Sequence, residues 1–115
     1  MIIRKAELTR DLRAQMRGGE GTAQLDLVSV ANALAPKCAL CGNITLHAGD
    51  SIGYHEHHGE CEIFQILQGE ALVSDKGSET VLRVGDYFFT PSGSGHSIAC
   101  YGAGPLVFSA IIIRD

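Results

Sequence analysis

From Ala39 to the C-terminus, the sequence alternates short runs of strand-forming residues with turns rich in glycine. β-Branched and aromatic residues fill the runs, whereas Gly, Pro, Asp and Ser gather between them. We expect strands at residues 39–47, 51–57, 62–67, 70–74, 80–84, 87–90, 96–101 and 106–114. No helical stretch separates these strands, so the pattern argues against a βαβ fold and predicts an all-β antiparallel barrel or jelly roll.

The first part of the chain is less regular. Residues 22–30 alternate like a strand, residues 11–17 fit either one or two helical turns or an extended arm, and residues 31–37 fit a loop or a short helix broken at Pro36. We therefore expect residues 1–37 to form an N-terminal arm and first strand that pack on a barrel of residues 38–115. A chain of 115 residues is long enough for one hydrophobic core but not for two, so both parts belong to one domain.

Composition and charge argue against several functional classes. No apolar run is long enough to cross a membrane, and the N-terminus lacks the apolar core and cleavage site of a signal peptide, so we expect a cytoplasmic protein. The formal net charge of −4 argues against general nucleic-acid binding, which requires a basic surface. The basic residues of the N-terminus are more typical of a solvated segment than of an anion-binding tail.

Histidines and a glutamate stand at the ends of three predicted strands. His55 and His57 are two residues apart, and the period of a strand places both imidazoles on one face, about 7 Å apart along the backbone. Glu62 opens the next strand, where it can return a carboxylate to the same point. A lone His-x-His pair is more often a solvated hairpin, but a loop rich in Pro and Gly delivers His96 as a fourth ligand. Imidazoles and a carboxylate suit zinc, iron, manganese, nickel or cobalt.

The spacing of these residues resembles the two sequence motifs of the cupin family. The first motif, G-x5-H-x-H-x(3,4)-E-x6-G, is matched by Gly49, His55, His57, Glu62 and Gly69. The second, G-x5-P-x-G-x2-H-x3-N, is matched by Gly85, Pro91, Gly93 and His96, with Cys100 in place of the asparagine. The chain therefore resembles a small single-domain cupin of the "cupin 2, conserved barrel" type, in the RmlC-like superfamily.

The resemblance implies a double-stranded β-helix, a jelly-roll barrel with a short N-terminal extension, that holds one divalent transition metal. The metal ligands would be His55, His57, Glu62 and His96, which leave about two positions of an octahedral ion open. Cupins include isomerases, dioxygenases, decarboxylases and proteins that only bind sugars, so the fold does not choose a reaction. We expect a metal-dependent enzyme acting on a small polar metabolite, a sugar, uronate or organic acid. A non-catalytic metabolite- or sugar-binding module and a storage role are the alternatives.

The four cysteines do not match a known site. Cys38 and Cys41 form a C-x2-C pair, but a structural zinc site needs a second pair and a thioredoxin-like site needs a βαβ context. In a flat strand these two cysteines face opposite sides, which disfavours a disulfide between them. We expect Cys61 to face away from the metal and Cys100 to be a core thiol.

Apolar residues on both faces of two predicted strands indicate that something covers the barrel. Ile63 and Leu67 have outward parity on one strand, and Ile111 and Ile113 share one face of the last. The cover is either the chain's own residues 1–30 or a second copy. Because small cupins pair their sheets and exchange N-terminal strands, the resemblance favours a homodimer.

Overall fold

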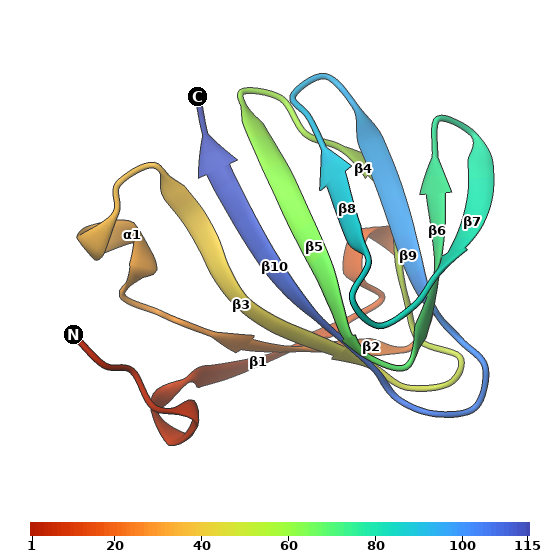
Figure 1. The fold of residues 1–115 in the computed structure, drawn as a ribbon, viewed down its shortest axis with the longest axis horizontal. Helices are drawn as coiled ribbons and strands as arrows, with labels where there is room; N and C mark the ends of the chain where they lie inside the picture. Colours follow the sequence, from red (N-terminus) through yellow and green to blue (C-terminus); the bar gives the residue numbers. More distant parts are fainter.

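Two antiparallel sheets pack face to face in the computed structural model, which describes residues 1–115 (Figure 1). The six-stranded sheet contains, in spatial order, β1 (Thr9–Ala14), β2 (Thr22–Leu27), β3 (Cys38–Leu46), β10 (Leu106–Arg114), β5 (Glu60–Gln68) and β8 (Tyr87–Thr90). The four-stranded sheet contains β4 (Ser51–Glu56), β9 (Gly95–Tyr101), β6 (Glu70–Asp75) and β7 (Ser78–Leu82). The predicted all-β architecture is confirmed.

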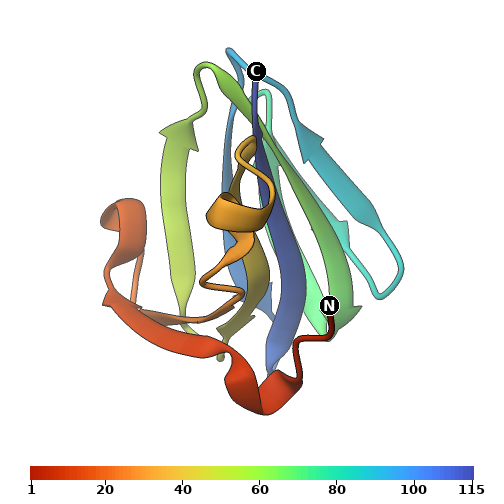
Figure 2. The same ribbon diagram turned by 90° about the vertical axis from the view of Figure 1, so that its left-hand side faces the viewer.

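The N-terminal residues continue the six-stranded sheet. β2 is hydrogen-bonded to β3, and β1 lies outside β2 as the edge strand (Figure 2). Three short helical elements accompany these strands: η1 (Lys5–Glu7), η2 (Met16–Gly18) and α1 (Ala31–Leu34). Residues 11–17 therefore take mainly the extended alternative, and residues 31–37 contain the short helix. No helix in the chain combines the length and the apolarity needed to cross a membrane. The cytoplasmic location stays a prediction.

The turn between β6 and β7 is shorter than the sequence indicated. Asp75 pairs with Ser78, so only Lys76 and Gly77 form the turn. Both turn residues have positive φ, 51° and 81°, as in the two-residue hairpin turns whose twist matches that of the flanking strands. β7 therefore begins two residues before the expected strand 80–84.

The hydrophobic core lies between the two sheets. Alternate residues of β10 point into it, and Leu106, Phe108 and Ala110 have no exposed surface. The Phe108 ring packs edge to face on Phe64 of β5, with ring centroids 4.7 Å apart. Burying one phenylalanine side chain stabilises the fold by about 1.5–3 kcal/mol. The packing of Phe108 on Phe64 therefore stabilises the pairing of β5 with β10.

A bulge in β4 turns the first histidine inward. Ile52 pairs with Ile98 of β9, and His55 pairs with His96, so two residues of β4 lie opposite one of β9. In a regular strand Ile52 and His55 would point to opposite faces. The extra residue brings both side chains to the interior, while Tyr54 stays exposed.

A second bulge, in β3, shows that the prediction of opposite faces for Cys38 and Cys41 is wrong. Cys41 pairs with Ile111 of β10, and Cys38 pairs with Ile113 after a register shift. Ile111 and Ile113 share one face of β10, and directly opposite residues of neighbouring strands share a face. Both cysteines therefore lie on the outer face of the six-stranded sheet. All four cysteines are free.

Candidate metal centre

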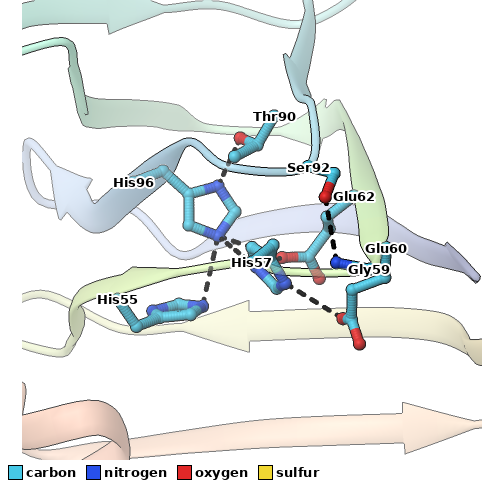
Figure 3. Close-up of polar contacts among 8 residues, drawn as sticks. All are labelled: His55, His57, Gly59, Glu60, Glu62, Thr90, Ser92 and His96. Atoms are coloured by element: carbon cyan, nitrogen blue, oxygen red, sulfur yellow. Dashed lines mark hydrogen bonds and ion pairs between the residues drawn. The ribbon is translucent and has the colours of Figure 1, made fainter.

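Four side chains from three strands and one turn converge on one point (Figure 3). His55 lies on β4, His57 follows in the turn, Glu62 lies on β5 and His96 lies on β9. Their ligand atoms all lie within 4.8 Å of one another. The convergence expected from the sequence is present, and the cluster contains no cysteine.

The distances between the donor atoms have the size expected for ligands of one ion. The Nε2 atom of His96 lies 3.1 Å from Nε2 of His57 and 3.2 Å from Nε2 of His55. The Oε1 atom of Glu62 lies 3.0 Å from the Nε2 atoms of both His57 and His96. With metal–ligand bonds of about 2.1 Å, neighbouring donors lie about 3.0 Å apart in an octahedron and about 3.4 Å apart in a tetrahedron. The observed distances are closer to the octahedral value.

The outer nitrogens of two histidines set the protonation of the ring nitrogens that face the centre. The Nδ1 atom of His55 lies 2.8 Å from the Gly53 carbonyl oxygen, and Nδ1 of His57 lies 3.0 Å from Oε2 of Glu60. A carbonyl and a carboxylate can only accept, so each Nδ1 carries the proton. In the neutral ring the Nε2 lone pair then faces the centre, which is the arrangement that binds a metal.

The third histidine is held by a hydroxyl and by packing. The Nδ1 atom of His96 lies 2.7 Å from Oγ1 of Thr90, and both residues are buried. Phe64 stacks on the imidazole, with ring centroids 4.9 Å apart and an interplanar angle of 15°. These contacts fix the ring orientation before any ligand arrives.

The chemistry of this donor set fits a bound cation. The Nε2 lone pair of His57 and the Oε1 atom of Glu62 lie 3.0 Å apart, and neither residue is more than 5% exposed. Burial lowers the pKa of His55, and the neighbouring His96, His57 and Arg17 lower it further, against a smaller opposing effect of its bond to Gly53. His55 is therefore neutral near pH 7, and a divalent ion is the charge that would relieve the repulsion among these donors.

Sequence reasoning missed the residues that hold the ligands. Glu60 is the one with a local signal, because it begins β5 only three residues after His57. Gly53 contributes only a backbone carbonyl, and Thr90 reaches His96 from another strand, β8. His58, which the spacing left without a partner, is exposed and pairs with Glu56 at 3.1 Å.

Comparison with known proteins identifies the class to which this fold and centre belong. Residues 42–113 match the family model described as "Cupin domain", and the chain belongs to the cupin family. It is 38% identical over 113 residues to the "Oxalate-binding protein" of Thermotoga maritima, a match that covers 98% of this chain and 93% of that protein.

Solved structures agree with this assignment. A crystal structure from Thermotoga maritima, described as a predicted oxalate decarboxylase, is 37% identical with a TM-score of 0.94, and each chain covers all of the other. A putative sugar phosphate isomerase from Acidithiobacillus ferrooxidans shares only 21% identity, with a TM-score of 0.75 over 99% of this chain and 75% of that one. The second likeness concerns the fold alone.

Proposed function

We propose that the protein binds one divalent transition metal through His55, His57, Glu62 and His96, and that it chelates a small organic acid on that metal. The donor distances support octahedral binding. Glu62 and the Nε2 atoms of His57 and His96 lie 3.0–3.1 Å apart, as do three donors on one face of an octahedron. His55 would supply the fourth donor, because its Nε2 atom lies 3.2 Å from Nε2 of His96.

Four protein donors would leave about two positions of an octahedral ion open, where a small organic acid could bind through two of its oxygens. The donor distances of 3.0–3.2 Å are the observation that carries the proposal.

Oxalate is the candidate ligand among small organic acids. Its two carboxylates present oxygens that close a five-membered chelate ring on adjacent positions. The Thermotoga maritima relative named for oxalate binding aligns over almost the whole chain, which favours an organic acid over a sugar or uronate.

Calorimetric titration of metal-loaded protein tests this function. We expect Mn²⁺- or Co²⁺-loaded protein to bind one oxalate per chain more tightly than acetate or succinate, because neither of these closes a five-membered chelate. A His57→Ala variant, which loses the metal, is the matched control and should show no oxalate heat. A fully metal-loaded protein that binds acetate and oxalate equally would contradict chelation.

Oxalate decarboxylation is the second candidate, favoured by the description of the structure that is 37% identical. In this reaction the carbon–carbon bond of hydrogen oxalate breaks, and its proton ends on carbon to give formate and carbon dioxide. Formate release from oxalate by metal-loaded protein would make it an enzyme. Stoichiometric binding without formate would make it a binding module.

We also propose a homodimer formed through the six-stranded sheet. Its outer face carries a continuous apolar row across four strands, in which each residue pairs with the next: Phe89, Ile63, Ile111 and Cys41. Phe89 is 57% exposed in the single chain, and Leu67 and Ile113 are also exposed. A second copy would cover this row. Light scattering should give twice the chain's 12.2 kDa; a mass near 12.2 kDa would reject the dimer.

A further inference from the structure

The row of inward side chains that carries Glu62 continues across the six-stranded sheet as aliphatic residues. Strands β5, β10 and β3 lie side by side (Figure 1). Glu62 pairs with Ile112 of β10, and Ile112 pairs with Leu40 of β3. Directly opposite residues share a face and have Cβ atoms about 4.5–5.5 Å apart. Ile112 therefore borders the metal centre, and Leu40 lies one strand further along the same inner face.

Ile112 and Leu40 point inward, but the core does not fully cover them. On β10, Ala110 shares a face with Ile112 and has no exposed surface, whereas Ile112 is half-buried. On β3, Ile44 is 2% exposed, whereas Leu40 on the same face is half-buried. The space between the sheets is therefore filled deeper in the core, while beside Glu62 aliphatic surface stays uncovered.

A third aliphatic side chain, Leu27 of β2, extends this surface. Leu27 pairs with Gly42 of β3 and is half-buried. A Cβ atom at Gly42 would lie 3.0 Å from Cδ2 of Leu27, so the leucine side chain leans over the glycine on the inner face. We call Leu27, Leu40 and Ile112 the aliphatic wall. None of the three side chains can form a hydrogen bond.

The donors of the metal centre come from other parts of the interior. They belong to β4, the turn after it, β5 and β9, whereas the inner faces of β10 and β3 next to Glu62 carry aliphatic side chains. The part of a metal-bound ligand that extends from Glu62 toward β10 would therefore lie against hydrocarbon. A carboxylate oxygen there would lose water without gaining a donor, whereas a methylene group would gain from burial.

This arrangement deepens the proposed function and rests on it. We propose that the aliphatic wall is a subsite for a short hydrocarbon group, and that the metal centre takes 2-oxo acids with aliphatic side chains. A 2-oxo acid chelates a metal through one carboxylate oxygen and the keto oxygen, in the same five-membered ring that oxalate closes. Its alkyl group replaces one of the two oxygens that oxalate turns away from the metal.

Titrations of cobalt-loaded protein with pyruvate, 2-oxobutyrate and 2-oxopentanoate, followed by the visible spectrum of Co²⁺, test the subsite. The three acids have the same charge and the same chelating atoms, and each differs from the next by one methylene group. Burial of one methylene group corresponds to about a fourfold gain in affinity. We expect the wild type to show about this gain at each step of the series.

Two wall variants and one matched control locate the subsite. Ile112→Ala should remove most of the gain, because it deletes the part of the wall next to Glu62. Leu40→Ala should reduce the gain as well, and it decides the question if Ile112→Ala loses cobalt or does not fold. Ile113→Ala makes the same change at the next residue of β10, which has the opposite parity and is 39% exposed. This control should keep the full gain.

The outcomes separate the subsite from the proposed function. If the wild type binds oxalate but binds the three 2-oxo acids equally, or binds the longer ones more weakly, the subsite is wrong and chelation stands. A gain that persists in both wall variants, or that Ile113→Ala loses to the same extent, also overturns the subsite. If no acid, oxalate included, changes the cobalt spectrum, the proposed function fails and the subsite fails with it.

Discussion

Replacing Glu60 by alanine is expected to weaken metal binding without disturbing the fold. Glu60 does not belong to the set of four ligands, but its carboxylate accepts the Nδ1 proton of His57 at 3.0 Å. Without that acceptor the imidazole is free to adopt the other tautomer, with a proton on the nitrogen that faces the centre, and it also becomes a weaker base. Both effects reduce affinity for the ion.

The size of the loss follows from the exposure of the two partners. Removing a group that orients a ligand histidine typically costs 10–100-fold in metal affinity, about 1.4–2.8 kcal/mol. The Glu60 side chain is 29% exposed, so water can replace its carboxylate and the lower end, about tenfold, is expected. Thr90 is only 2% exposed, and water cannot easily reach the place of its hydroxyl. Thr90→Val should therefore approach the hundredfold end.

Competition with a chromophoric chelator for Zn²⁺ measures both losses. The matched control is Glu56→Ala, because Glu56 is a neighbouring glutamate whose carboxylate pairs only with the exposed His58. We expect that control to bind zinc like the wild type. An equal loss in Glu56→Ala and Glu60→Ala would mean that overall negative charge, and not orientation of His57, sets the affinity. If neither Glu60→Ala nor Thr90→Val lowers the zinc affinity, the reasoning is refuted.

Three further predictions concern the ligands, the core and the contact between residues 15–20 and β4. His57→Ala should lower bound metal, measured by elemental analysis, far more than Cys38→Ser, because only the histidine belongs to the donor cluster. Equal losses would give the C-x2-C pair a metal-binding role. Phe108→Ala should lower the free energy of unfolding by about 3–5 kcal/mol in urea titrations, because the fully buried ring leaves a cavity; a loss under about 1 kcal/mol would show that the core closes around it. Gly53→Ala should lower both the melting temperature and the zinc affinity, because the added Cβ would collide with the Arg17 carbonyl oxygen while the Gly53 carbonyl holds His55. An unchanged melting temperature and zinc affinity would contradict the close approach of Arg17 to Gly53.

The sequence by itself determined the class of fold and the four converging residues. Both depend on local regularities: strand-forming runs alternate with turn residues, and the two-residue period puts His55 and His57 on one face. Glu62 and His96 were proposed from their positions at the starts of later strands, and the family motifs then supported both, because no two-residue period joins them to the first pair. All four residues lie together in the structure.

Only the tertiary structure decided how those ligands are held. The bulges in β3 and β4 each change side-chain parity by one residue, and they arise from the register that core packing imposes between strands. Thr90 of the six-stranded sheet meets His96 of the four-stranded sheet because the two sheets pack face to face, and residues 15–20 meet Gly53 across more than thirty residues of sequence. Such contacts depend on how separate elements pack against one another, whereas a sequence pattern records only the preferences of neighbouring residues.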